Sequence, residues 1–386
     1  MSLNDSVPPP AAQDARPSTP PPGGSAASPG TAEDIFARGR ARSPLVKVVG
    51  VSHIVLERPL LDDMRHFLLD FGLRRSAQDR HGDYFRGSSG AHHLVAVRRA
   101  PTPRFAGVAF VAAERGDLDV LTRVAGASGV EPTDEAGGGE RVRLRSPSGL
   151  EVQVVHGVRE LAPLQTRAAL STNRVRQRHR VNSPQRRDRG PAQVERLAAV
   201  SWQTPDVEHD AGWFMQTFGL IASDYLVLGE RTKQAMGAFL RVDLGRTPVD
   251  HHAIALFAGP RGRLLSASFE VLDFDDIAVG GEHLYATGAK HVWGPGRHEA
   301  GSALFDYWRD PHGDVLGHVS DGDLFNAEIV PREVRLSRSA LQQWGRPLPP
   351  DFFDAQQESG PLRQLGGLIT NDHAARRWAR FARALR

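Results

Sequence analysis

Cysteine is absent from the 386 residues of this chain, and that absence removes several classes of protein at once. Disulfide bonds, Cys-ligated zinc, iron–sulfur clusters and a thiol nucleophile are all excluded. A bound metal would need histidine, carboxylate or amide ligands, and the sixteen histidines of the chain keep that option open.

Long apolar runs are also missing. No stretch approaches the roughly 18 consecutive apolar residues that a membrane-spanning helix requires. The first 30 residues lack the apolar core of a secretory signal. We therefore expect a cytoplasmic protein with no membrane span.

Acidic residues are scarce in two segments, although the net charge of the whole chain is only +3. Residues 167–189 contain Asp188 as the one acid, and the last fourteen residues contain none. The first segment carries Arg167, Arg174, Arg176, Arg178, Arg180, Arg186, Arg187 and Arg189. It lacks aromatic residues for base stacking, so we expect a solvated, self-repelling linker and no nucleic-acid partner.

Composition divides the chain into five parts. Eight prolines fall within the first thirty positions, so residues 1–46 are predicted to form a disordered leader. Two similar domains are expected over residues 47–158 and 194–330, separated by the Arg-rich linker 159–193. Residues 331–386 form a C-terminal extension that ends in a basic amphipathic helix, which we expect to pack on the body of the protein.

The two domains are expected because the sequence repeats itself. Residues 67–73 read FLLDFGL and residues 214–220 read FMQTFGL, each at the end of a helical pattern. The pair His92-His93 recurs 159 positions later as His251-His252, each expected on a strand. Each half then reads as two βαβββ units, so the fold class is α+β with four units paired into two half-open barrels. The mouth of such a barrel is a natural ligand cavity.

This organisation resembles the vicinal oxygen chelate superfamily of glyoxalases, bleomycin-resistance proteins and extradiol dioxygenases. The two-domain, type I extradiol ring-cleaving dioxygenases are the most similar subgroup. The resemblance rests on short motifs of the second half in matching order: Thr204-Pro205-Asp206, Phe239-Leu240-Arg241, Asp250-His251-His252, Phe269-Glu270-Val271, 294–298 (GPGRH), 305–311 (FDYWRDP) and 344–352 (WGRPLPPDF).

The resemblance implies Fe(II), sometimes Mn(II), held in the second domain by two histidines and one glutamate. Here those ligand positions fall on Ala199, Ser266 and Gly317. None of the three replaces an imidazole or a carboxylate. His318 follows Gly317, but neighbouring strand residues face opposite sides of a sheet. We therefore expect no cofactor; if one were bound, it would be Fe²⁺ or Mn²⁺.

The corresponding positions of the first half offer no replacement site. His53 stands at the first-strand position and Gln153 at the carboxylate position, but Gly107 occupies the middle one. Two neutral ligands suit a hard divalent cation poorly, so His53 is expected to be a satisfied core histidine.

The residues that surround the substrate in the family are, in contrast, present. The resemblance assigns catalytic roles to His251, His298 and Tyr307. Imidazole titrates near neutrality and can accept a phenolic proton, and a Tyr hydroxyl can donate to a developing oxyanion. Further substrate contacts are expected from His252, Asp306, Phe239 and Arg241.

Three functions remain open on the sequence alone. The first is a metal-independent enzyme acting on a phenolic, quinonoid or enolic small molecule by isomerisation, hydration, C–C cleavage or oxygenation. The second is a protein that binds or sequesters such a ligand without catalysis. The third is an Fe(II) extradiol catechol dioxygenase with atypical ligands. Proteins of this kind commonly assemble, so a homo-oligomer is compatible with the resemblance.

Overall fold

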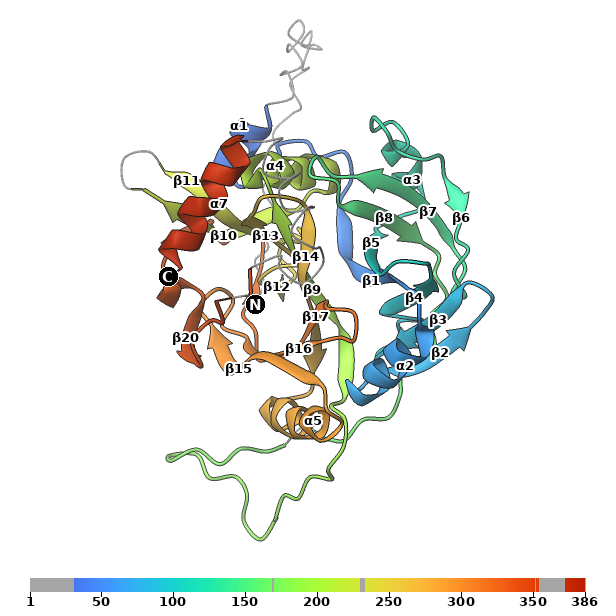
Figure 1. The fold of residues 1–386 in the computed structure, drawn as a ribbon, viewed down its shortest axis with the longest axis vertical. Helices are drawn as coiled ribbons and strands as arrows, with labels where there is room; N and C mark the ends of the chain where they lie inside the picture. Colours follow the sequence, from blue (N-terminus) through green and yellow to red (C-terminus); the bar gives the residue numbers. More distant parts are fainter. Residues whose placement is uncertain (1–30, 169, 230–232, 351, 354–371, 386) are drawn as a thin grey trace, which may run out of the picture.

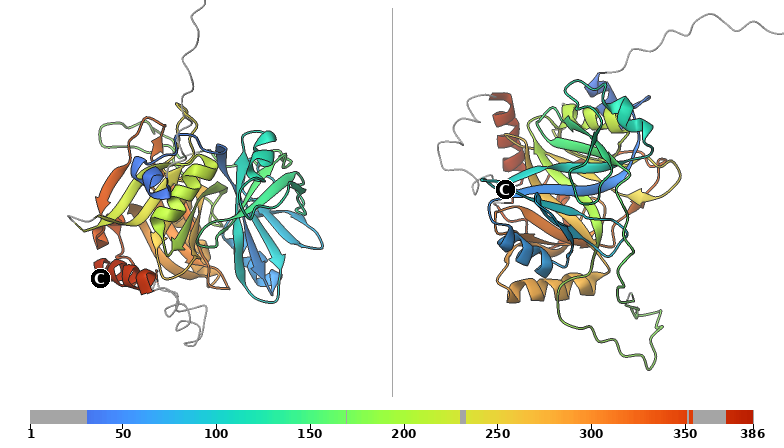
Figure 2. Two further views of the ribbon diagram at one scale, coloured as in Figure 1. Left: turned by 90° about the horizontal axis from the view of Figure 1, so that it is seen from above. Right: turned by 90° about the vertical axis from the view of Figure 1, so that its right-hand side faces the viewer.

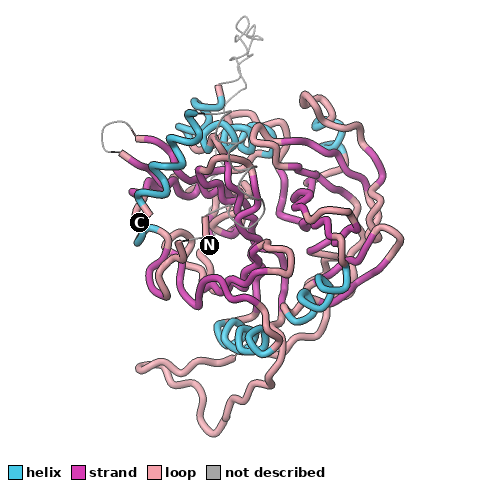
Figure 3. The backbone as a smooth tube through the Cα atoms, viewed as in Figure 1, coloured by secondary structure: helices cyan, strands magenta, loops and turns pink. Residues whose placement is uncertain are grey.

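The computed structural model describes residues 31–168, 170–229, 233–350, 352–353 and 372–385. Two large sheets, one from each half of the chain, lie side by side, as Figure 1 and the left view of Figure 2 show. Strands fill the interior of both halves, and the helices lie at the periphery (Figure 3). Among the described residues, no helix has the length and apolar character needed to cross a membrane.

The first sheet has eight strands in the order β2-β3-β4-β1-β5-β8-β7-β6. Its strands are β1 (Val48–Arg58), β2 (Arg74–Gln78), β3 (Gly82–Arg86), β4 (Val95–Arg99), β5 (Arg104–Ala112), β6 (Glu131–Pro132), β7 (Glu140–Arg145) and β8 (Glu151–His156). Helices α2 (Leu61–Asp70) and α3 (Gly116–Leu121) follow β1 and β5.

The second sheet has ten strands in the order β19-β10-β11-β13-β9-β14-β17-β16-β15-β20. Its strands are β9 (Val194–Thr204), β10 (Ile221–Leu228), β11 (Gln234–Arg241), β13 (Ile254–Ala258), β14 (Arg263–Val271), β15 (Lys290–His298), β16 (Leu304–Arg309), β17 (Val315–Ser320), β19 (Arg332–Arg335) and β20 (Gln342–Gly345). Helices α4 (Val207–Phe218) and α5 (Phe274–Ala286) follow β9 and β14. The short strands β12 (Val249–Asp250) and β18 (Leu324–Phe325) pair with each other, and a 3₁₀ turn, η1, spans Arg338–Ala340.

The two sheets share one arrangement at their centres, as the internal repeat predicts. β1 pairs antiparallel with β5, which pairs parallel with β8, and β9, β14 and β17 repeat this pattern. In the first sheet His53 lies opposite Ala109, which lies opposite Gln153. Because the two sheets share this register, equivalent residues of the two halves occupy equivalent positions in their own sheets. The paired histidines of each half stand just before β4 and β13 rather than within a strand, which corrects that detail of the prediction.

Buried polar contacts join the halves. Arg58 of β1 is fully buried and forms ion pairs with Asp310, at 2.8 Å, and with Asp314, both from the turn between β16 and β17. The His318 imidazole donates from Nε2 to the Phe71 carbonyl at 2.7 Å, across the same boundary. Burial lowers the pKa of His318 to about 4, so it stays neutral at physiological pH.

The leader is not irregular throughout, which corrects part of the prediction for residues 1–46. Residues 1–30 lie outside the described residues, but α1 (Ala32–Arg38) is a capped helix. The Thr31 hydroxyl and the Asp34 carboxylate cap its first turn reciprocally. Phe36 packs on Tyr225, whose hydroxyl donates to the Phe36 carbonyl at 2.7 Å. Apolar residues of this short segment therefore bury it against the second half.

The Arg-rich linker is anchored at two points rather than being solvated throughout. Arg167 forms ion pairs with Asp273 and Asp276 at the start of α5, and Arg187 forms an ion pair with Asp276. The Asp276 side chain is fully buried, so each guanidinium compensates a buried carboxylate. Between these anchors the chain forms the long loop that projects beyond α5 in Figure 1.

The C-terminal helix α7 (Asp372–Ala384) packs on the second half, as its amphipathic pattern predicts. Phe381 is fully buried and meets the Phe353 ring edge-on at 5.0 Å between ring centroids. The Arg377 guanidinium donates to the Ala235 carbonyl at 2.9 Å. The helix therefore belongs to the body of this half.

Replacing Arg58 with Met should destabilise the protein strongly. The substitution leaves the Asp310 carboxylate buried without its cation, and an orphaned buried charge costs about 3–5 kcal/mol. Denaturant titration measures this loss. The matched control is Arg104→Met, which removes a half-exposed partner of Glu57 and should cost no more than about 1 kcal/mol. Equal losses in the two variants would contradict a stabilising contact between the halves.

Candidate active site of the second half

The second half encloses a cavity of about 380 Å³. Its walls are largely aromatic and aliphatic, and a few polar side chains project into it. The apolar lining includes Phe239, Phe257, Leu265, Trp293, Val319, Phe352 and Phe353. The polar lining includes His251, His252, Ser266, Ser268, His298 and Tyr307. An apolar cavity with a small set of convergent polar groups is the usual form of a small-molecule site.

The three positions where the resemblance would place metal ligands lie at this cavity. Ala199 and Ser266 line it, while Gly317 lies directly opposite Tyr307 on the neighbouring strand. A Cβ atom at position 317 would overlap Cδ1 and Cε1 of the Tyr307 ring. The phenol ring thus occupies the space that a glutamate side chain would need. Only neutral hydroxyls remain there as donors, so these residues do not fit an iron or manganese site.

His298 and Tyr307 form a hydrogen-bonded pair at the cavity wall. The Nδ1 of His298 lies 3.1 Å from the Leu341 carbonyl, which can only accept, so Nδ1 carries the proton. The Nε2 of His298 is then free to accept from the Tyr307 hydroxyl at 2.9 Å. Burial lowers the pKa of His298 to about 4, against a smaller opposing effect of the Leu341 carbonyl. His298 is therefore a neutral base at physiological pH.

Burial raises the pKa of Tyr307 to about 12. Hydrogen bonding to the hydroxyls of Ser268 and Ser266 works in the opposite direction, because it stabilises a phenolate. Tyr307 therefore remains protonated, and its hydroxyl interacts both with these serine hydroxyls and with the His298 base.

A second chain of polar contacts ends at the same cavity. The His251 Nε2 donates to Asp224 at 3.2 Å, and the Nδ1 atoms of His251 and His252 lie 3.1 Å apart. Burial holds the pKa of His252 well below the usual value, so its ring is neutral and one of its two ring nitrogens carries no proton.

Asp224, at the far end of this chain, is an ionised carboxylate. Burial works to raise its pKa, but the hydrogen bonds from His251 and from Arg332, at 2.8 Å, outweigh it and keep the pKa below its usual value. The arrangement follows the logic of a catalytic triad, in which a buried carboxylate fixes the tautomer of the imidazole before it.

The structure brings most of the predicted site residues together. His251, His252, His298, Tyr307 and Phe239 all line the cavity, and the Phe239 ring meets the His252 ring edge-on at 5.2 Å. His252, expected only as a contact, holds the position of a proton acceptor.

Two predicted substrate contacts lie elsewhere. Asp306 neighbours Tyr307 on β16 and so faces the opposite side of the sheet, where it accepts from His291 at 2.8 Å and from Trp308 at 2.9 Å. The Arg241 guanidinium is fully buried and donates to carbonyl oxygens that include those of Ala222 and Asn326, so it fastens the loop after β18.

In the first half, the structure brings His53 together with His93, noted in the sequence only as part of the repeated histidine pair, and with Glu135, which the sequence analysis did not consider. His93 and Glu135 lie beside it, and Glu135 comes from the loop between β6 and β7. Their spacing along the chain follows no motif, and only the fold brings them into contact.

Comparison with known proteins shows which proteins this chain is similar to in sequence and in fold. No family model matches the chain. Metapyrocatechase 2 of Cupriavidus necator is 29% identical over 165 residues, which are 42% of this chain and 48% of that protein. The chain therefore matches about half the length of this relative.

Solved structures match over most of the chain. The Mn(II)-bound glyoxalase from Novosphingobium aromaticivorans has a TM-score of 0.64 and 24% identity, covering 82% of this chain and 95% of its own. Homoprotocatechuate 2,3-dioxygenase from Brevibacterium fuscum, in its anaerobic substrate complex, has a TM-score of 0.67 and 18% identity, covering 82% and 94%. The Arthrobacter globiformis homoprotocatechuate 2,3-dioxygenase has a TM-score of 0.67 and 18% identity, covering 81% and 92%.

These structures define the class. The chain has the vicinal oxygen chelate fold, so the resemblance seen in its sequence is confirmed at the level of the fold. Within that class, the chain is similar in fold to the homoprotocatechuate 2,3-dioxygenases and, over part of its length, similar in sequence to metapyrocatechase 2.

Gly317→Ala should destabilise the protein because the added methyl group meets the Tyr307 ring. Overpacking of this kind costs about 1–3 kcal/mol in the free energy of unfolding. The loss should shrink when Tyr307→Ala is introduced first, so a double-mutant cycle should show coupling between the two positions. Gly50→Ala, on a strand with open space around the added carbon, is the matched control and should be nearly neutral. Additive losses at positions 307 and 317 would contradict the contact.

Proposed function

We propose that the second half binds an uncharged phenolic, quinonoid or enolic small molecule and moves protons on it without a metal ion in that cavity. The observation that carries this proposal is the His298–Tyr307 pair, which faces the cavity at the place where Gly317 leaves room for a phenol ring. The extradiol-dioxygenase-like fold supports the phenolic part of this class, since the neighbouring structures include a complex with the catechol 3,4-dihydroxyphenylacetate; the acetate group of that ligand has no counterpart in the substrate proposed here.

The shape and charge of the cavity support a planar, uncharged ligand. Aromatic side chains form its walls, and they favour stacking and edge contacts with an aromatic ring. Among the residues that line the cavity, Arg196 carries a permanent positive charge. Its guanidinium already pairs with Asp250 at 2.6 Å and with Glu270 at 2.6 Å. Asp323 adds further negative charge, whereas Asp321 pairs with Arg297 at 2.8 Å, so the lining offers no uncompensated cation for an anionic substrate.

Proton transfer would use the two series of hydrogen-bonded side chains described above, one with Tyr307 and His298 and the other with His252 and His251. In one, a ligand hydroxyl gives its proton to the Tyr307 oxygen as Tyr307 passes its own proton to His298 Nε2. In the other, neutral His252 would accept a proton at Nε2, while its Nδ1 lies 3.1 Å from Nδ1 of His251, which is held in turn by Asp224. The resulting oxyanion would be stabilised by hydroxyl donors rather than by a Lewis acid.

Metal ligation at this cavity is not part of the proposal, because the residues at the ligand positions do not fit it. A ligand-sequestering protein is the second candidate, favoured by the aromatic walls of the cavity. Binding without turnover of any phenol or enol tested would select that candidate.

Substitutions at the two polar chains test the catalytic proposal. His298→Ala and His251→Ala should each lower turnover by on the order of 10²–10⁴, the usual range for a general acid or base. Tyr307→Phe should cost roughly 10–10³, as expected for an oxyanion donor. The measurement is absorbance-monitored turnover across a panel of catechols, phenols and enols. The control is His209→Ala, an exposed position on α4. Near-wild-type turnover and affinity in all three variants would refute the site.

The pH dependence of activity should be that of an enzyme whose base is buried. His298 acts only when neutral, so activity should be lost as pH falls through about 4 rather than through 6.5. His251, His252 and Tyr307 are the titratable groups that face it, and the pKa of Tyr307, about 12, predicts no loss up to pH 10. The measurement is kcat/KM against pH. An acidic limb near 6.5 would show that a solvated histidine is the base.

A further inference from the structure

A second cluster of chemistry-bearing side chains lies in the first half, far along the chain from the cavity described above. It consists of His53 on β1, His93 in the segment before β4, and Glu135 in the loop between β6 and β7. Within the described part of the chain, this is the one group of three His, Asp or Glu residues whose ligand atoms lie within 4.8 Å of one another. The exposed fractions of the three side chains are 1%, 1% and 3%.

The contacts within the cluster match the spacing of ligands around one ion. Oε2 of Glu135 lies 3.0 Å from Nε2 of His53 and 3.1 Å from Nε2 of His93. Neighbouring donors bonded at about 2.0–2.2 Å to a single ion are separated by roughly this distance. The His53 Nε2 atom is buried and makes no hydrogen bond, although the carboxylate oxygen is so close. Because Nε2 of His53 lies near Oε2 of Glu135 without a hydrogen bond to it, the lone pair of this nitrogen is available to a cation.

The atoms of these residues that would face away from the ion all have partners. Nδ1 of His53 bonds to the Ser52 hydroxyl at 3.0 Å, and Nδ1 of His93 bonds to Nδ1 of His92 at 3.0 Å. Outer partners of this kind fix the tautomer and orientation of metal-binding histidines.

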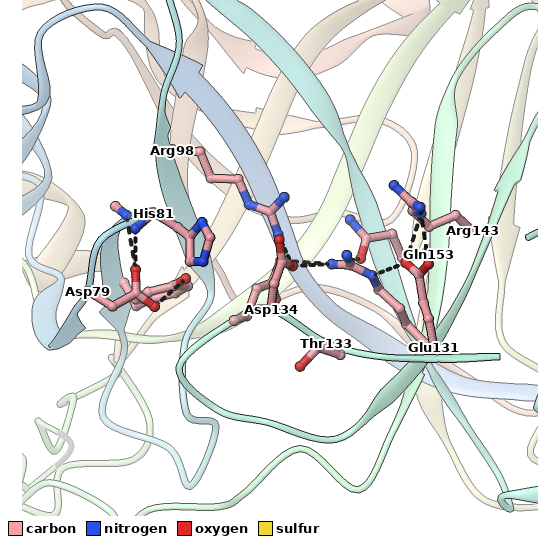
Figure 4. Close-up of polar contacts among 12 residues, drawn as sticks. Asp79, His81, Arg98, Glu131, Thr133, Asp134, Arg143 and Gln153 are labelled. Carbon is pink, nitrogen blue, oxygen red and sulfur yellow. Dashed lines mark hydrogen bonds and ion pairs between the residues drawn. The ribbon is translucent and has the colours of Figure 1, made fainter.

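The second oxygen of Glu135 is held in the same way, since Oε1 accepts from Arg98 at 2.8 Å. Arg98 also bonds to Asp134 at 2.9 Å (Figure 4). Asp134 in turn pairs with Arg141. Arg141 also pairs with Glu131 at 2.9 Å, so both guanidinium groups are shared with carboxylates outside the cluster. Within the cluster, Arg98 bonds to Oε1 of Glu135, which leaves Oε2, beside the two imidazoles, as the atom that would bind a cation.

We propose that His53, His93 and Glu135 bind one divalent transition-metal cation, such as Zn²⁺, Fe²⁺, Mn²⁺ or Co²⁺. Two imidazoles and one carboxylate suit ions of this class, whereas Mg²⁺ and Ca²⁺ prefer oxygen ligands alone. Three protein ligands leave coordination positions open for water or a small oxygen ligand.

An entry path reaches the cluster from the space between the two halves. His93, together with Ser52, His92 and Arg159, lines a cleft of about 1120 Å³ whose other wall comes from the second half. A cation and its remaining ligands can therefore arrive from solvent. The site does not depend on the chemistry proposed for the second half.

A purely structural role for the cluster is the competing explanation. In that case Glu135 accepts hydrogen bonds from the two imidazoles, and its loss would lower stability without changing any affinity for metal. Metal affinity, measured separately from stability, distinguishes the two explanations.

The experiment titrates the full, chelator-treated chain with Co²⁺ and follows visible absorption and metal content after equilibrium dialysis. We expect one Co²⁺ per chain, and an affinity that falls at least 100-fold in Glu135→Gln and in His93→Asn. The control is His298→Gln, which removes an imidazole from the other half and should leave Co²⁺ affinity unchanged. Far-UV circular dichroism establishes that each variant folds.

Should both cluster variants fail to fold, thermal unfolding of the wild-type chain keeps the proposal testable. Saturating Co²⁺ should raise its Tm, and it should do so equally in His298→Gln. Three results would overturn the proposal: no stoichiometric Co²⁺ on the wild-type chain, unchanged affinity in folded Glu135→Gln and His93→Asn, or loss of binding in His298→Gln. An unchanged Tm in Co²⁺ would also overturn it.

Discussion

The close approach of Tyr307 to Gly317 across β16 and β17 determines what the cavity of the second half can do. Because position 317 carries no side chain, the phenol ring lies flat over the strand and its hydroxyl reaches His298. The same contact removes the room for a carboxylate ligand. The absence of a side chain at position 317 therefore leaves a hydrogen-bonded Tyr–His pair at the place where the resemblance expects a carboxylate.

The common register of the two sheets makes the halves comparable residue by residue. His53 in the first half occupies the level of Ala199 in the second, and each faces the interior of its own half. The first half keeps an imidazole at this level, and the loop between β6 and β7 supplies the carboxylate. The second half keeps paired histidines and a tyrosine around an apolar cavity. The proposals divide the two functions between the halves, with cation binding in one and proton transfer in the other.

Sequence alone predicted the repeated βαβββ units because the helix ends and the histidine pairs recur in the same order in both halves, after 147 and 159 residues. It also predicted the cavity residues whose spacing follows a motif, such as His298 and Tyr307. It missed the partnership of Glu135 with His53, since the two meet only through the path of a loop. Asp306 was misplaced because the alternation of side chains along a strand turns it away from Tyr307. The helix α1 was missed because its few apolar residues follow a long proline-rich segment.

The most direct test of this account locates the cation. Crystals of the full chain grown with Co²⁺ would be measured by anomalous diffraction at the cobalt edge. The account predicts one anomalous peak enclosed by His53, His93 and Glu135, and none beside Ser266 and Tyr307. A peak in the second-half cavity, between Ser266 and the Tyr307 hydroxyl, would contradict both the metal-free chemistry proposed there and the division of roles between the halves.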